Sequence, residues 1–105
     1  MPNPLDDPLG IAYELLRQHR YEEAHKRFEW LAANGSVPAL TYLGYMHDHG
    51  LATSADPEKA RSLYLKAAEA GDAEGQYFLA MFCMRHGDLQ ESVRWNVKAA
   101  AQSHV

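Results

Sequence analysis

The stretch from Lys66 to Ala80, KAAEAGDAEGQYFLA, ends one helical run and starts another with no linker between them. Its alanine-rich first half, up to Ala70, favours helix. Gly71 can adopt the left-handed backbone conformation that ends a helix. The carboxylate of Asp72 can then accept hydrogen bonds from the free amides of a new first turn. The stretch therefore predicts two consecutive helices joined by a tight turn.

The same signals recur 36 residues earlier in the chain. Gly35 and Ser36 again place a glycine directly before a capping residue. The same shift matches Ala24 with Ala60, Phe28 with Tyr64, Ala32 with Ala68 and Ala39 with Gly75. A period in the thirties is typical of stacked helical hairpins, which bury their apolar faces against one another.

Other capping residues divide the rest of the chain. Asp7 and Asp56 each precede a proline at a first helical position, and Asp88 with Glu91 forms a capping-box pattern. Six helices are predicted, over residues 8–18, 21–34, 37–49, 57–70, 73–86 and 89–102. Short turns make consecutive helices antiparallel neighbours. The prediction is one all-α domain over residues 1–105, a right-handed α-solenoid of three stacked antiparallel helix hairpins, with repeats at about 6–35, 36–71 and 72–104.

Small residues occur at related positions of the paired helices. They are Ala12, Gly44 and Ala80 in the first helices and Ala24, Ala60 and Ser92 in the second helices. Each small pair is expected to let two helix backbones approach closely. The members of the middle pair lie farther apart in sequence than those of the other two, because the loop GLATSAD, residues 50–56, lengthens that hairpin.

The stretch from Tyr42 to Ala80 resembles the SEL-like repeat family, a branch of the tetratricopeptide-repeat-like superfamily. The residues that fit the family pattern in the middle repeat are Ala39, Leu43, Gly44, Gly50, Asp56, Lys59, Ala60, Tyr64, Lys66, Ala67, Ala68 and Gly71. The third repeat keeps Leu79, Gly87, Trp95, Lys98, Ala99 and Ala100. The first repeat is closer to a plain tetratricopeptide unit. The resemblance implies an adaptor or scaffold for protein complexes, and it does not imply catalysis.

Composition excludes several classes of partner. The net charge is −4, the isoelectric point is near 5.8 and no basic patch is present, so nucleic-acid binding is not expected. No run of apolar residues is long enough to cross a membrane. The first ten residues lack the pattern of a signal peptide. A cytoplasmic protein that binds neither nucleic acid nor membrane is therefore expected.

The residues that could carry metal or catalytic chemistry do not form a recognisable site. His47 and His49 point about 200° apart on a helix, so they cannot share one metal ion. His47 and Cys83 occupy the same inner position of neighbouring repeats, which indicates core packing. An apolar setting should keep the Cys83 thiol protonated and inert. No nucleophile–base pattern, paired carboxylates or phosphate-binding loop is visible. The sequence predicts no catalytic residue, no bound metal and no cofactor.

The face of the first helices that lines the concave side of such a stack carries the residue types enriched at protein interfaces. The predicted partner-binding residues are Tyr13, Arg17, Tyr45, Asp48, His49, Tyr77, Met84 and Arg85. Leu16, Thr41 and Met81 fall on the same face. Arg17 and Arg85 would favour acidic groups of a ligand. The alternative is that some of these side chains serve only to pack neighbouring repeats.

The sequence therefore predicts a non-catalytic module that binds a peptide or protein segment in a concave groove. Two alternatives are a self-assembling structural unit and a specific inhibitor or immunity protein. The last helix has an apolar pattern that no later helix in the sequence covers, and stacked repeats need a polar cap to stay soluble. Val93 and Val97, with Trp95 at the edge, are therefore expected to be covered, and a homodimer is the first choice of partner.

Overall fold

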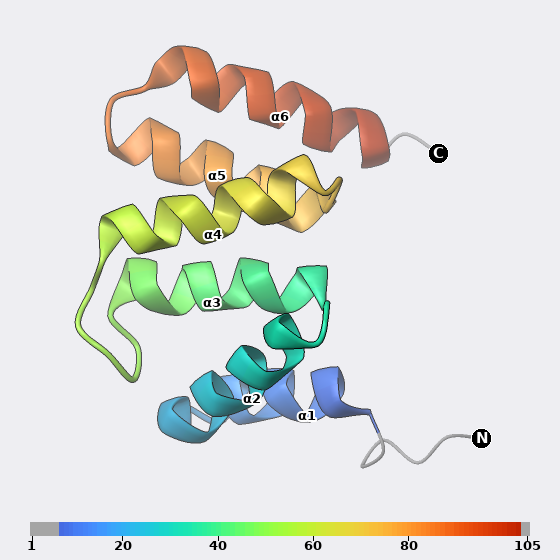
Figure 1. The fold of residues 1–105 in the computed structure, drawn as a ribbon. Helices are drawn as coiled ribbons and strands as arrows, with labels where there is room; N and C mark the ends of the chain where they lie inside the picture. Colours follow the sequence, from blue (N-terminus) through green and yellow to red (C-terminus); the bar gives the residue numbers. More distant parts are fainter. Residues whose placement is uncertain (1–6, 104–105) are drawn as a thin grey trace.

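The structure, a computed structural model, describes residues 7–103 and folds this range into six α-helices without a strand (Figure 1). Each helix starts at the predicted residue and ends within one residue of the predicted end. The helices are α1 (Pro8–Arg17), α2 (Tyr21–Ala33), α3 (Val37–His49), α4 (Pro57–Glu69), α5 (Ala73–Arg85) and α6 (Leu89–Ser103). The all-α prediction of three stacked hairpins is confirmed.

The turn at Gly71 combines the end of one helix and the start of the next. Gly71 has a φ of 93°, and its amide donates to the Ala68 carbonyl over 3.0 Å. The Asp72 amide donates to the Ala67 carbonyl over 3.1 Å, which completes the hydrogen-bond pair of a Schellman motif. The Asp72 carboxylate then accepts from the Gly75 amide over 2.9 Å. A left-handed glycine also follows α2 at Gly35 and α5 at Gly87.

The helices stack in chain order from α1 to α6, as Figure 1 shows. Each helix packs on the next one, and α3 also contacts α5. The core forms two clusters of buried side chains, one centred on Phe28, Leu43 and Met46, and the other on Tyr64, Leu79 and Trp95. Because the first cluster joins the first two hairpins and the second joins the last two, no hairpin has a core of its own.

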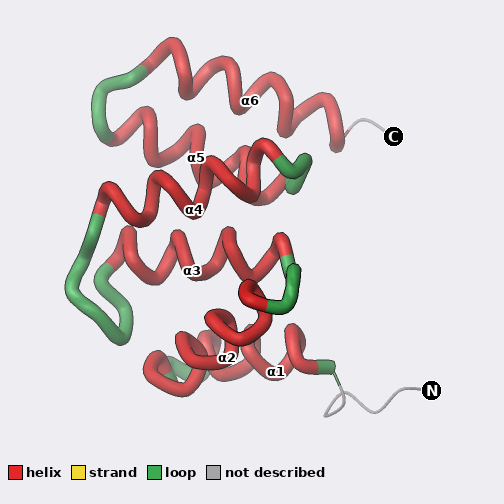
Figure 2. The backbone as a smooth tube through the Cα atoms, viewed as in Figure 1, coloured by secondary structure: helices red, strands yellow, loops and turns green. Residues whose placement is uncertain are grey.

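The middle hairpin packs closely because α3 has a glycine where it meets α4. A Cβ atom at Gly44 would lie 2.7 Å from Cδ1 of Tyr64 and 3.3 Å from the carbonyl oxygen of Ala60. The expected close approach of the two backbones is confirmed here. Loop 50–56, visible in Figure 2 as the longest green segment, then leads into α4, where the Asp56 carboxylate accepts from the Lys59 amide over 3.1 Å.

The turn between α1 and α2 has the same hydrogen bonds but lacks the usual residues. His19 stands where Gly87 stands after α5, and it adopts a φ of 62°. Its amide donates to the Leu16 carbonyl over 3.0 Å. Arg20 occupies the capping position and its side chain makes no capping hydrogen bond. His19 is thus held in a left-handed conformation, which costs an L-residue about 1–2 kcal/mol.

Replacing His19 with glycine should stabilise the protein. The substitution relieves the left-handed strain and costs about 0.5–1 kcal/mol of glycine chain entropy, so we expect the free energy of unfolding to rise by about 0.5–1 kcal/mol. Urea unfolding of His19→Gly and of the reciprocal variant Gly87→His measures the free energy of unfolding of each. The first should be more stable than the wild type and the second less stable. An unchanged or lower free energy of unfolding for His19→Gly would show that His19 carries no such strain.

Candidate functional site

A row of aromatic rings runs across the first helices α1, α3 and α5. The ring centroids of Tyr13 and Tyr42 lie 4.8 Å apart, and those of Tyr42 and Phe78 lie 5.9 Å apart. Tyr45 lies 5.8 Å from Phe78 on the same face. All four rings are partly buried, so their edges support the core while part of each surface faces solvent. Sequence reasoning missed Tyr42 and Phe78, which directly follow Thr41 and Tyr77, the residues that it assigned to this face.

Two hollows adjoin along this row, and together they form a groove. The larger has a volume of about 560 Å³, and the smaller has a volume of about 160 Å³. Tyr45 and Phe78 line both and form the wall between them. The larger hollow is also lined by Leu16, Arg17, His19, Tyr21, Tyr42 and Leu51. The smaller is also lined by Asp48, His49, Tyr64, Tyr77, Met81 and Arg85.

The smaller hollow is lined by an ion pair between two repeats, in which the carboxylate is buried and the guanidinium is partly exposed. The Asp48 side chain is only 3% exposed, and its carboxylate accepts hydrogen bonds from both terminal nitrogens of Arg85, one of them over 3.2 Å. The Tyr64 hydroxyl donates to Asp48 Oδ2 over 3.1 Å. Burial, followed by the negative charge of Asp48, raises the pKa of Tyr64, which therefore stays protonated. The carboxylate and the guanidinium are thus already paired within the chain.

Two further polar contacts fix α5 against α3. The Tyr42 hydroxyl donates to Glu74 over 2.5 Å and 2.9 Å to the two carboxylate oxygens. Burial, with this hydrogen bond as the second cause, raises the pKa of Tyr42. Thr41 is fully buried, and its hydroxyl donates over 2.7 Å to Asp72, the residue that caps α5. Thr41 therefore belongs to the contact between repeats and lies outside the groove.

The structure brings six of the eight predicted partner-binding residues to the two hollows. These six are Arg17, Tyr45, Asp48, His49, Tyr77 and Arg85. Tyr13 lies behind them, against Phe28 and Tyr42, and contributes to packing. Met84 is 48% exposed on α5 but lines neither hollow. Arg17 lies at the rim and is paired with Glu14, with the nearest atoms 2.5 Å apart.

The last helix, α6, exposes an apolar stripe, and Trp95 does not belong to it. Val93 and Val97 are each 62% exposed, and Leu89, one turn earlier, is 63% exposed. Trp95 is only 5% exposed and belongs to the core cluster, with its indole nitrogen donating to Glu91 over 3.2 Å. The expectation that Trp95 lies at the edge of this stripe is wrong, because its position on α6 faces α5.

His25, His47 and Cys83 are placed for packing. His25 and His47 meet between α2 and α3, with ring centroids 5.3 Å apart. Nε2 of His25 and Nδ1 of His47 are buried and have no hydrogen-bond partner in the described part of the chain. Within residues 7–103, no three histidine, cysteine or acidic side chains are grouped to hold a metal ion. Cys83 is buried, and burial raises the pKa of its thiol.

Comparison with known proteins finds one repeat family. The family model for the Sel1 repeat matches residues 37–72 and 73–104. A Sel1-repeat-containing protein of Escherichia coli K12, YjcO, is 50% identical over 46 residues, which is 44% of this chain and 20% of that protein. An uncharacterised YjcO protein of Shigella flexneri matches to the same extent. The chain thus spans about a fifth of the length of these relatives.

A solved structure agrees with the fold. The crystal structure of a Sel1 repeat protein from Oxalobacter formigenes superposes with a TM-score of 0.81 at 32% sequence identity. The match covers 93% of this chain and 41% of the other chain, so it includes the first hairpin as well as the two repeats that the family model matches. Among residues 7–103, no helix is long and apolar enough to cross a membrane.

The burial of His47 should make the stability of the protein depend on pH. Burial, with repulsion from Lys59 and His25, lowers the pKa of His47 below its ordinary 6.5, although Asp56 and Glu29 act in the opposite direction. Below about pH 6.5 the unfolded chain therefore binds more protons at this site than the folded chain. The free energy of unfolding should fall as the pH drops from 7.5 to 5.5.

The matched variant for this measurement is His47→Gln, which keeps a polar side chain of similar size and removes the titration. Its urea unfolding curves should depend less on pH between 7.5 and 5.5 than those of the wild type. Equal pH dependence in the two proteins would show that His47 does not cause the effect.

Proposed function

Since this chain belongs to the Sel1 repeat family, we propose that it is a non-catalytic module that binds a segment of another protein in the groove across α1, α3 and α5. Sel1 repeat proteins are generally protein-interaction modules. The observation that carries the proposal is the pair of adjoining hollows that share Tyr45 and Phe78 as a wall.

The chemistry of the groove favours contact through aromatic and apolar surface. Asp48 and Arg85 satisfy each other, and Arg17 is paired with Glu14, so neither hollow presents an unpaired charge of these residues to a ligand. Tyr77 is 49% exposed beside the smaller hollow, and aromatic side chains of this kind supply large contact area at protein interfaces. An extended segment with apolar side chains one or two residues apart could place one side chain in each hollow, on either side of the wall formed by Tyr45 and Phe78.

Self-assembly is a second candidate function, favoured by the stripe on α6. Leu89, Val93 and Val97 follow one another at intervals of four residues, so they lie along one side of the helix. Two antiparallel copies of α6 with a twofold axis at Val93 would place Leu89 of each copy over Val97 of the other. Such a stripe complements itself, as an isologous dimer requires. We propose a dimer through this stripe as an activity additional to groove binding.

Truncating Tyr77 should weaken partner binding without unfolding the protein. Half of this side chain is exposed, and its ring packs beside Phe78, with the two centroids 6.0 Å apart. Alanine replacement of a tyrosine anchor at an interface costs about 2 kcal/mol, or roughly a thirtyfold loss of affinity. The measurement is capture of host proteins on immobilised protein, followed by titration of the captured partner with wild type and Tyr77→Ala.

The control for this experiment is Glu58→Ala, an exposed residue of α4 that lines neither hollow of the groove, which should bind like the wild type. Thermal unfolding is recorded for each variant. Equal affinity of Tyr77→Ala and wild type, with both proteins folded, would place the binding surface elsewhere.

The proposed dimer predicts a concentration-dependent mass. Sedimentation equilibrium should show the 11.8 kDa chain moving toward twice that mass as concentration rises. The double substitution Val93→Glu and Val97→Glu should keep the protein monomeric, because it places like charges within the contact. Both side chains are 62% exposed, so the variant should stay folded. A wild type that remains monomeric at millimolar concentration would rule out this dimer.

A further inference from the structure

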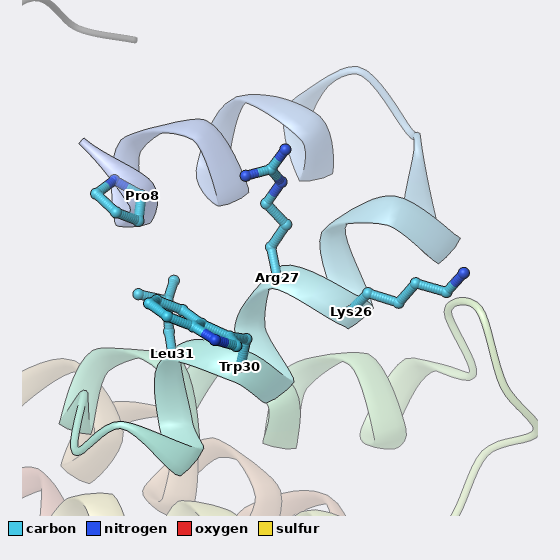
Figure 3. A pocket seen from close by; sticks show the side chains of 5 residues that line it. All are labelled: Pro8, Lys26, Arg27, Trp30 and Leu31. Atoms are coloured by element: carbon cyan, nitrogen blue, oxygen red, sulfur yellow. The ribbon is translucent and has the colours of Figure 1, made fainter. Parts of the chain in front are cut away.

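A third hollow lies between α1 and α2, apart from the groove. It has a volume of about 370 Å³ and is lined by Pro8 of α1 and by Lys26, Arg27, Trp30 and Leu31 of α2. Figure 3 shows Arg27 reaching from α2 toward α1, while the Trp30 ring and Leu31 lie on the side of Pro8. Of the two tryptophans in the chain, Trp95 is only 5% exposed, whereas Trp30 is 60% exposed. None of these residues lines either hollow of the groove.

Comparison of the three repeats shows that Trp30 has no role in the repeat core. The shift that matches Phe28 with Tyr64 places Trp30 at the position of Lys66 in the second repeat, and Lys98 holds that position in the third. Lys66 and Lys98 are exposed. A large aromatic side chain therefore stands where the other repeats keep a charged, solvated one, and the stacking of the hairpins does not require it.

The hollow itself arises from a second departure in the same helix. Arg27 stands where the other repeats have Leu63 and Trp95. Trp95 is buried against its hairpin and Leu63 is partly buried, whereas Arg27 is exposed. The apolar side chain that would cover this part of the first hairpin is thus replaced by a cation. The surface left beside it contains the Trp30 ring, Leu31 and Pro8.

Arg27 differs from most arginines of the chain in its pairing. Arg17, Arg20, Arg85 and Arg94 each contact a carboxylate. Lys26 and Arg27 make no ion pair with any carboxylate in the part of the chain that the structure describes. The nearby Glu29 is directed at His25 instead, with the atoms 3.0 Å apart. In a chain of net charge −4, this hollow thus places two cations, neither of them paired with a carboxylate within residues 7–103, beside an exposed tryptophan.

We propose that this hollow binds an acidic segment of a partner protein that carries one large apolar side chain. The apolar side chain would occupy the space between Trp30, Leu31 and Pro8. Carboxylates on either side of it would pair with Arg27, whose planar guanidinium can hold a carboxylate through two hydrogen bonds, and with Lys26 at the rim. Tryptophan and arginine are among the residues most enriched in the positions that dominate interface energetics.

The test uses the full chain and a random library of 12-residue peptides displayed on phage. Selection on the wild type is followed by depletion on Trp30→Lys, which installs the residue found at this position in the other two repeats and should leave the fold intact. Enriched peptides are synthesised with a fluorophore, and their affinities are measured by anisotropy. Circular dichroism and urea unfolding establish that every variant is folded.

Four variants locate the binding surface. Affinity should fall at least tenfold with Trp30→Lys and with the double substitution Lys26→Glu and Arg27→Glu. The matched control makes the same charge change on α4, with Lys59→Glu and Arg61→Glu, and should weaken binding less than threefold. Tyr77→Ala, in the groove, should leave the affinity unchanged, so the two sites are tested separately.

The enriched peptides should share two or more acidic residues around a phenylalanine, tryptophan, leucine or methionine. Their affinity should also decrease as salt is raised from 50 to 500 mM, because the charge contacts are at the surface. The proposal is overturned if no peptide survives depletion on Trp30→Lys, or if the shared pattern is neutral or basic. It is equally overturned if the α4 control loses as much affinity as the change at Lys26 and Arg27.

Discussion

The close contact between Gly44 and Tyr64 is the constraint on which the rest of the structure depends. Because α3 has no side chain at Gly44, the Tyr64 ring packs directly on the α3 backbone and is only 1% exposed. From this position its hydroxyl reaches Asp48, and its ring lies 6.0 Å from both Phe78 and Phe82 on α5. One side chain of α4 thus sets the spacing of α3 and α5, and this spacing defines the walls of the smaller hollow.

The buried Asp48 turns this packing into a specific alignment of two repeats. A carboxylate that is 3% exposed is costly to bury unless its oxygens are hydrogen-bonded and its charge is paired. Tyr64 of the same repeat and Arg85 of the next satisfy both requirements only when α5 lies at one position along α3. The ion pair therefore fixes the register of the groove, and it leaves ligand recognition to the aromatic surface of residues such as Tyr45 and Tyr77.

The sequence was sufficient to predict the helices and most of the residues that line the smaller hollow, because these depend on local signals. Gly71 followed by Asp72 fixes a turn wherever it occurs, and the face of α3 that carries Tyr45, Asp48 and His49 follows from helical periodicity. The burial of Trp95 and the pairing of Arg85 with Asp48 depend on which helix lies opposite, and periodicity within one helix does not contain that information. The exposure of Trp30 could have been found by aligning it with Lys66 and Lys98, since the repeat itself shows which positions face solvent.

Three departures from the repeat pattern, His19, Arg27 and Trp30, lie in the first hairpin. Each of them lines one of the hollows to which we assign a partner. His19 replaces a glycine, and its strained backbone brings its ring to 5.5 Å from Tyr21 at the edge of the larger hollow. Arg27 and Trp30 replace an apolar and a charged residue, and together they line the hollow between α1 and α2. Each substitution breaks a local rule that the other two repeats obey. Proteins tend to break such rules where function requires it. The first hairpin therefore supplies residues both to the larger hollow of the groove and to the hollow between α1 and α2, which are the two surfaces we assign to a different protein as partner.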